Sequence, residues 1–571
     1  MRTSALAQPV VTTPVARPGL SLDVAVPLLA LSSLLGMPIA LIATSAFNVG
    51  DPEALPVTEY GFGPILEIFE HLDWIWHSIA MSACATVLCV AIGVTLAWIV
   101  NRTQLPAAGL FRILITIPYP LGPLVGALAW VELAAPDGGL INKAYVSLTG
   151  MPGPLIDITS LGGIVFVLAL VEAPVVFLMV GAAMDRMNPA LEECASVIGA
   201  NHWRTALRIS LPLMMPAILS AAVFVFSATM AAFAIPAILG AKSRFYVVTT
   251  AIYVLFQGYP PNLPLASALG LLLIGFTALS VWMSARILRG RSYVVVTGKT
   301  YRPQPIDVRG WKPLLTGIVC LYVFLSLVLP LGTLLIASLQ TSSDLRFDPS
   351  DWTLANYAYV ILDLPTTRQA IVNSVILGIA TGTIGVFLST LLAIIVHRAD
   401  NRAGRILEQV IMLPQAFPRL IFAFGFLWMI LLLPFKIYGT LFALLLGYLV
   451  IFLPLGYRAM SGVVVQVDRA LDEAAQVFGA GRARVLWSIT LPLLRPGMVS
   501  TWALLFMVSI GEVSASIFLV SGGIQVLGPA VLNFWESGGL PQVSALVIVQ
   551  SGIVLLTMLL IGRGTAALAR G

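Results

Sequence analysis

Twelve long apolar runs dominate this sequence and constrain what the chain can fold into. Each is about twenty residues or longer, which is the length that an α-helix needs to cross the hydrocarbon core of a bilayer. Hydrophobic residues make up 59% of the 571 and charged residues only 10%, whereas a soluble domain carries roughly 25% charged residues. A soluble enzyme is therefore excluded. The runs lie near 22–47, 75–100, 111–133, 161–183, 213–240, 264–287, 313–338, 370–396, 407–433, 441–460, 493–520 and 543–562.

The runs predict membrane helices, because the strands of a membrane barrel would give alternating segments of about ten residues. The predicted fold is all-α, a polytopic membrane bundle of about twelve helices. Basic residues in short loops mark the cytoplasmic side. The segment 286–312 carries seven Lys and Arg against one acid, whereas 48–74 carries six acids and no Lys or Arg. We expect the first segment and both termini in the cytoplasm, and the second segment outside.

The two sets of six runs repeat each other in sequence. An even number of helices in each copy gives both copies the same orientation, and parallel repeats of this kind place a pathway between them. We divide the chain into a first half (1–290), a basic linker (291–312) and a second half (313–571). The pairs matched at an offset of 296 and then 280 residues include Ser78 with Ser374, Arg102 with Arg398, Glu193 with Glu473, and Gly199 with Gly479.

The clearest repeated segment follows the fourth run of each half, and we call its copies the first elbow (188–212) and the second elbow (468–492). Each has an acid, a glycine six residues later, and an Ile-x-Leu-Pro step that begins ten residues after the glycine. Acids favour the first turn of a helix, and glycine favours its end. The defining residues are Glu193, Ala195, Gly199, Ile209, Leu211 and Pro212 in the first elbow, and Glu473, Ala474, Ala475, Gly479, Ile489, Leu491 and Pro492 in the second.

Each elbow is thus predicted to be two short helices joined at its glycine, on the cytoplasmic side of the membrane. Such a rigid element can transmit a push from a soluble partner into the bundle. The spacing resembles the EAA loop of ABC importer permeases, with Cys194 in place of the middle alanine of the first copy. This resemblance implies that the elbows dock on ATP-binding subunits, one for each elbow.

The resemblance extends over nearly the whole chain. Segments 137–142, 233–240 and 296–300 are similar to those of the fused permeases of the ferric-iron type, which are type I importers. Membership would imply a homodimeric ATPase subunit, a periplasmic solute-binding protein, a location in the bacterial inner membrane, and ferric iron as the solute. Thiamine, polyamine, sulfate and 2-aminoethylphosphonate permeases share much of the pattern, so these other solutes stay open.

No pattern in the sequence predicts covalent catalysis, a cofactor or a nucleic-acid partner. Gly298-Lys299-Thr300 lacks the glycine that a phosphate loop needs five residues earlier, since residue 293 is a tyrosine. Any ATPase must therefore be a separate subunit. The four histidines are scattered without metal-ligand spacing. A secondary transporter and a non-transporting scaffold are the rival classes, and the paired elbows argue against both.

Charges inside the apolar runs are costly unless they face a cavity or find a partner. Arg419 and Glu512 break the symmetry of the halves, since Glu512 stands opposite Ala232 in the repeat. One interpretation places both on the substrate path, and the other has them near the interfaces or paired within the bundle. The third run of each half is rich in proline, which bends helices and serves either gating or packing there.

Overall fold

The computed structural model describes residues 22–52, 57–185, 187, 194–195, 199, 202–288, 308–342, 349–398 and 402–568. Within these residues the chain is helical, and the only β pairing consists of three isolated bridges. Ten helices are long and apolar enough to cross a membrane, or twelve if two sharply bent helix pairs each count as one span. The predicted all-α bundle is thereby confirmed.

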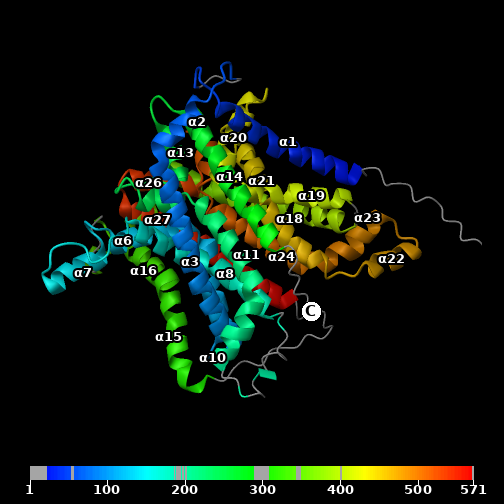
Figure 1. Cartoon of the computed structure of the whole chain (residues 1–571), viewed down its shortest axis with the longest axis horizontal. Coiled ribbons are helices and arrows are strands. Elements are labelled where there is room, and N and C mark those ends of the chain that lie inside the picture. Colours follow the sequence, from blue (N-terminus) through cyan, green and yellow to red (C-terminus); the bar gives the residue numbers. More distant parts are fainter. Residues whose placement is uncertain are drawn as a thin grey trace, which may run out of the picture.

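The predicted spans correspond to the long helices of Figure 1. In the first half these are α1 (Leu22–Ser45), α3 (Leu72–Arg102), α8 (Leu161–Asp185), α11 (Leu211–Met230) and α14 (Leu263–Leu288). In the second half they are α15 (Lys312–Val323), η4 (Phe324–Val328) and α16 (Leu329–Leu339) as one span, then α18 (Pro365–Arg398), α21 (Leu441–Val464), α24 (Leu491–Ile510) and α27 (Leu540–Leu568).

Shorter helices connect the spans. They are α2 (Gly63–Glu67), η1 (Ile68–His71), α7 (Leu140–Thr149), α10 (His202–Thr205), η2 (Ala206–Ser210), α12 (Ala234–Leu239), α13 (Val248–Gln257), η3 (Arg309–Trp311), η5 (Pro349–Asp351), α17 (Ala355–Ala358), η6 (Tyr359–Asp363), α22 (Arg469–Val477), α23 (Arg482–Val485), η8 (Leu486–Thr490), α25 (Ser516–Leu519) and α26 (Leu527–Glu536). The long helices in the runs predicted over 213–240 and 493–520 thus end earlier than predicted, at Met230 and Ile510.

The third span of each half is a bent pair of helices, where the sequence suggested one run. In the first half α4 (Ala108–Thr116) and α5 (Pro118–Leu121) meet α6 (Pro123–Ala134) at 92°, and in the second half α19 (Arg402–Met412) and η7 (Leu413–Ala416) meet α20 (Arg419–Leu432) at 104°. Pro123 directly follows the first break and Pro418 lies within the second, and proline disfavours helical backbone in the residue before it. Gly122 has φ +89°, a left-handed conformation that suits glycine.

Equivalent helices pack in equivalent ways within the two halves. In the first half α3 packs on α8 and α11, and in the second half α18 packs on α21 and α24. The first span of each half packs on the last span of its own half and also on the other half, since α1 lies against α14 and α20, and α16 lies against α27 and α6. The contact of α1 with α20 is very close, because a Cβ atom on Gly425 would lie 2.5 Å from the carbonyl oxygen of Pro38. The halves are therefore interlocked.

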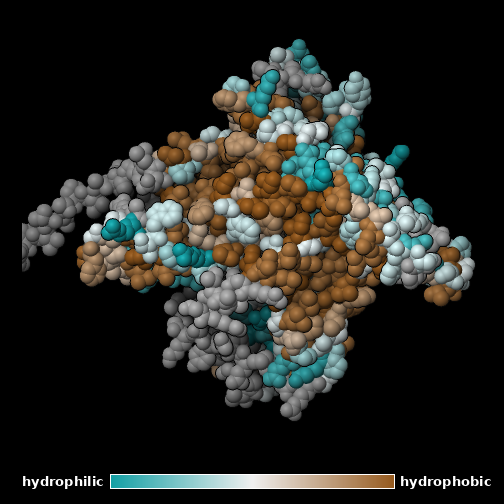
Figure 2. All heavy atoms as spheres, turned by 180° about the vertical axis from the view of Figure 1, so that it is seen from behind, coloured by the Kyte–Doolittle hydropathy of each residue, from teal (hydrophilic) through white to brown (hydrophobic). Residues whose placement is uncertain are grey.

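The outer surface is divided between apolar and hydrophilic regions. Figure 2 shows apolar side chains over the middle of one face and hydrophilic ones gathered toward its edges. In Figure 1, α22 and α23 project at the right and α10 lies at the bottom, with the label of the C-terminus between them, so all three lie on the side of the bundle turned away from α2 at the top and α7 at the left. Both elbows thus leave the bundle at the same end. The basic linker lies largely outside the described residues.

Candidate functional site

The second elbow has the two-helix form that its sequence predicts. Asp468 caps the first helix, α22, because its carboxylate accepts a hydrogen bond of 3.0 Å from the backbone N–H of Ala470. After Gly479 the chain continues through α23 and the π-helix η8 into α24, which begins at Leu491. The first elbow follows the same course from α10 through the π-helix η2 into α11. The predicted Ile-x-Leu-Pro steps therefore form the junctions where the chain re-enters the bundle.

Both predicted turn glycines have a left-handed backbone. Gly199 has φ +82° and Gly479 has φ +84°. In the second elbow the N–H of Gly479 donates to the carbonyl of Gln476 (2.9 Å), and the N–H of Ala480 donates to that of Ala475 (3.0 Å). This pair of bonds is the Schellman motif, which ends helices with glycine in this conformation. The glycines thus set the direction in which each elbow turns.

The other predicted elbow residues fall into three groups. Ile209, Leu211 and Pro212, with their counterparts Ile489, Leu491 and Pro492, form the re-entry junctions. Ala195 is buried beside the exposed Cys194, and Ala474 and Ala475 belong to α22. Glu473 also belongs to α22, and Glu193 lies outside the described residues.

Asp472 ties the second elbow to the bundle in two directions. Its carboxylate forms an ion pair with Arg398 at the end of α18, and it accepts a hydrogen bond of 3.0 Å from Thr490 at the start of α24. A cavity of about 470 Å³ lies beneath these contacts, lined by the ends of α18, α21 and α24. Asp472 is the acid in the first turn of α22. A displacement of α22 would be passed to α18 and α24 through this residue.

The second elbow exposes large apolar side chains at its tip. Val477 is 85% exposed and Phe478 is 91% exposed, and Trp487 on η8 is also largely exposed. The helix α22, which ends at Val477, projects from the bundle in Figure 1. Grouped apolar side chains on a hydrophilic end of a protein are typical of a surface that another protein covers.

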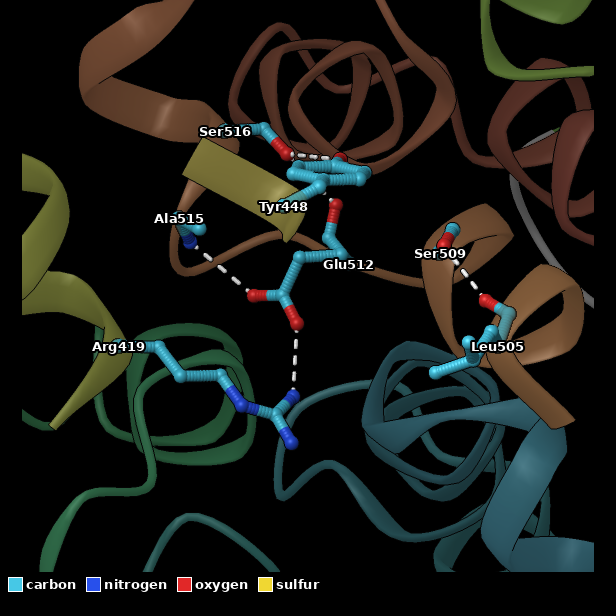
Figure 3. A network of polar contacts seen from close by, with 7 residues as sticks. All are labelled: Arg419, Tyr448, Leu505, Ser509, Glu512, Ala515 and Ser516. Atoms are coloured by element: carbon cyan, nitrogen blue, oxygen red, sulfur yellow. Dashed lines mark hydrogen bonds and ion pairs between the residues drawn. The ribbon is translucent and has the colours of Figure 1, made fainter. Parts of the chain in front are cut away.

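Arg419 and Glu512, the two predicted path residues, form an ion pair deep in the bundle. Nη1 of Arg419, at the start of α20, lies 2.7 Å from Oε2 of Glu512, which follows the end of α24. Figure 3 shows the other oxygen of Glu512 accepting a hydrogen bond from the N–H of Ala515, at 3.0 Å. The Glu512 side chain is 3% exposed and that of Arg419 is 47% exposed. The carboxylate is therefore held rigidly behind a guanidinium that borders open space.

The surroundings of the ion pair fix its geometry. Ser516 donates a hydrogen bond of 2.9 Å to the carbonyl of Glu512, and the hydroxyl of Tyr448 lies 2.7 Å from that of Ser516. The guanidinium carbon of Arg419 lies 5.3 Å from the centre of the Phe452 ring, a favourable cation–π distance. Among the described residues no group of three or more His, Cys, Asp or Glu side chains is arranged to hold a metal ion.

Comparison with known proteins gives a consistent result. A family model described as the binding-protein-dependent transport system inner membrane component matches residues 89–292 and 385–570. The ferric transport system permease protein FbpB of Actinobacillus pleuropneumoniae is 27% identical over 487 residues, which cover 84% of this chain and 70% of that protein. A putative ferric transport system permease protein FbpB 1 of Haemophilus influenzae is 27% identical over 79% of this chain and 71% of its own length.

Two further similarities cover about half of the chain. The putative 2-aminoethylphosphonate transport system permease protein PhnV of Salmonella paratyphi A is 26% identical, over 44% of this chain and 96% of that protein. Among solved structures, a bacterial alginate ABC transporter in complex with a periplasmic protein bound to alginate pentasaccharide matches 46% of this chain and 92% of its own, at 18% identity and a TM-score of 0.40. We draw no argument from a structural likeness this low.

Proposed function

Because this chain belongs to the family of binding-protein-dependent transport system inner membrane components, we propose that it forms the transmembrane pathway of an ATP-driven importer whose ATPase is a separate homodimeric subunit. As a member of this family the chain is a multi-pass ABC permease and not itself an enzyme.

The observation that carries the proposal is the pair of elbows. They occupy equivalent positions in the repeat, leave the same end of the bundle, and turn at glycines with nearly the same φ. A dimer of identical ATPase subunits would offer two equivalent clefts, one to each elbow. The exposed Val477 and Phe478 would then be covered by the ATPase, and the anchoring of Asp472 to α18 and α24 would carry its movement into the bundle.

The orientation follows from the same proposal. The elbows, both termini and the basic linker 291–312 would lie in the cytoplasm of a bacterial cell, and the acidic segment 48–74 would lie in the periplasm. We propose the division into halves 1–290 and 313–571. A loaded solute-binding protein would dock outside, while ATP would close the ATPase dimer on the elbows and open the path between the halves outward.

Ferric iron is the solute that we propose first. Two relatives that match more than three quarters of this chain are named as ferric transport permeases. The relative named for 2-aminoethylphosphonate matches only 44% of the chain, so that solute comes second. Thiamine and polyamine follow on sequence resemblance alone. The separate solute-binding protein would make most of the selection.

Reconstitution tests the proposed function. The chain would be co-expressed with its ABC ATPase and solute-binding protein, placed in proteoliposomes, and assayed for uptake of radioactive ferric iron with and without ATP. We expect uptake that requires ATP and the binding protein. Uptake by this chain alone, driven by an ion gradient, would identify a secondary transporter instead. Omitting either partner is the matched control.

A further inference from the structure

A second polar region, beyond the Arg419–Glu512 pair, lies where the two halves meet in the middle of the bundle. Glu172 is near the centre of the 25-residue helix α8, and Gln550 is ten residues from the start of α27. The short helix α5, at the bend of the first half, contacts α8, α24 and α27. A Cβ atom on Gly511 would lie 3.4 Å from Nε2 of Gln550 and 3.9 Å from Cα of Gly122. These contacts bring α8, the helix that carries Glu172, to the interface where Glu512 and Gln550 lie.

Three side chains in this region have polar atoms left over that could bind a ligand. Oε2 of Glu172 is buried and has no hydrogen-bond partner among the described residues, and the same is true of both polar atoms of Gln550, which is fully buried. Arg419 uses Nη1 for Glu512, and its other terminal nitrogen points away from that carboxylate in Figure 3. Glu172 and Arg419 lie within electrostatic reach of each other.

Unsatisfied polar groups at this depth are costly and call for an explanation. The repeat shows that they are not needed to build the fold. The first-half positions that match Arg419, Glu512 and Gln550 are Pro123, Ala232 and Leu273, which are small or apolar. Glu172, which lies in the first half, matches the apolar Phe452 of the second half. None of these polar groups therefore has a polar counterpart in the other half, as expected for a site that binds a single solute molecule on an otherwise two-fold pathway.

We propose that Arg419, Glu172 and Gln550 form a binding site for a small solute that carries an oxyanion and a positive centre together. This inference rests on the proposed transport function and names the chemistry of the solute on its path. The free edge of the Arg419 guanidinium would bind the oxyanion, which is the geometry that arginine favours. The free oxygen of Glu172 would face the positive centre, and the amide of Gln550 would supply a donor and an acceptor.

The pairing of charges explains why neither a simple anion nor a simple cation fits. An oxyanion alone would be repelled by Glu172 and Glu512, and a cation alone would meet the accessible guanidinium first. Two kinds of solute carry both charges: a zwitterion, such as an amine with a phosphonate, and a metal ion carried with an oxyanion ligand. The site would bind either kind of solute through its paired opposite charges, and the experiment below distinguishes a zwitterion from a metal ion with an oxyanion ligand.

Calorimetric titration of the purified full-length chain in lipid nanodiscs tests the inference. The zwitterion arm compares 2-aminoethylphosphonate with ethylphosphonate, which lacks the amine, and the metal arm compares ferric citrate with citrate. Spermidine serves as a cation without an oxyanion. We expect one dipolar probe to bind at least about tenfold more tightly than its partner compound, because the partner leaves one buried charge of the site unpaired. Spermidine should not bind.

Substitutions then assign the binding to this site. Arg419→Gln and Glu172→Gln should each weaken the dipolar probe about tenfold or more. Glu512→Gln should bind as tightly or more tightly, because the amide oxygen can still accept from Ala515 while Arg419 is released. Arg458→Gln on α21 and Glu132→Gln on α6 are the matched controls and should bind as the wild type does. Should a glutamine variant fail to fold, Arg419→Lys and Glu172→Asp keep the charge and should still weaken binding.

Several results would overturn the inference. These are the absence of binding by either dipolar probe, equal binding of a probe and its partner compound, and binding that survives both the Arg419 and the Glu172 substitutions. Copurification of the ATPase subunit, scored on the same preparations, keeps the two proposals apart. An ATPase that copurifies without dipolar binding refutes the solute site alone, whereas failure of the wild-type chain to retain any ATPase refutes the proposed transport function.

Discussion

The left-handed turn at Gly479 is the feature of the second elbow that a single substitution can test most cleanly. A Cβ atom placed there would have no heavy atom within 4 Å, so a larger residue meets no clash. Its effect must come from the backbone, which has φ +84°. An L-residue in this conformation costs roughly 1–2 kcal/mol. Since 1.4 kcal/mol corresponds to about a tenfold change in an equilibrium constant, the substitution should lower the population of the native turn, relative to other backbone conformations, by about 5- to 30-fold.

A graded series separates this effect from a general loss of the elbow. Gly479→Asn should have the smallest effect, because asparagine tolerates left-handed backbone, Gly479→Ala an intermediate one, and Gly479→Val the largest, because a β-branched side chain tolerates it least. Gly481→Ala is the control, since Gly481 also has open space around it and its φ is outside the left-handed range. The measurement is the amount of ATPase subunit that copurifies with the affinity-tagged chain, at equal yield of folded chain by gel filtration.

Two results would refute the reasoning. One is a Gly479→Val variant that retains as much ATPase as the wild type, which would mean that the turn does not present the elbow to its partner. The other is a loss of ATPase in Gly481→Ala equal to that in Gly479→Ala, which would mean that any substitution in the elbow disturbs docking. Gly199→Val should reproduce the effect in the first elbow, where φ is +82°.

Three further predictions concern the anchoring of the second elbow, the packing of α1 against α20, and the orientation of the chain in the membrane. Asp472→Asn removes an ion pair and weakens a hydrogen bond of the second elbow. Because the ion pair is partly exposed, the substitution should barely change the melting temperature, but it should reduce the response of ATP hydrolysis to the loaded binding protein. An unchanged response would argue against a coupling role of Asp472. Gly425→Ala places a methyl group against the backbone of α1 and should lower the free energy of unfolding by about 1–3 kcal/mol. The variant should melt at a lower temperature in detergent than Gly275→Ala, a control at a position with open space around it. Equal melting temperatures of the two variants would contradict the close contact. Cys194 is exposed on the first elbow, so a membrane-impermeant maleimide should label it in inside-out but not right-side-out vesicles, with Cys194→Ser as the control; labelling from outside would reverse the proposed orientation.

Local physical preferences made part of this protein predictable from its sequence. Length and apolarity alone identify helices that can span a bilayer, which is why the runs and the long helices agree closely, as in 161–183 and α8 (Leu161–Asp185). Backbone preference identifies the glycine turns, since few residues other than glycine adopt the conformation of Gly199 and Gly479 at low cost. The prolines of the third runs marked a bend, although its angle could not be read from them.

Tertiary structure alone decided what the unusual charges and the first spans contact. Arg419 and Glu512 are 93 residues apart, and their sequence environment allowed either an exposed path or a closed pair. The structure joins them and leaves one side of the guanidinium accessible. It also places the unsatisfied Gln550 at the same interface, a residue that only its mismatch with Leu273 in the repeat could have marked. It also packs α1 on the second half. Hydropathy and backbone preference act within a few residues of the chain, whereas ion pairing and helix packing depend on which distant segments the fold brings together.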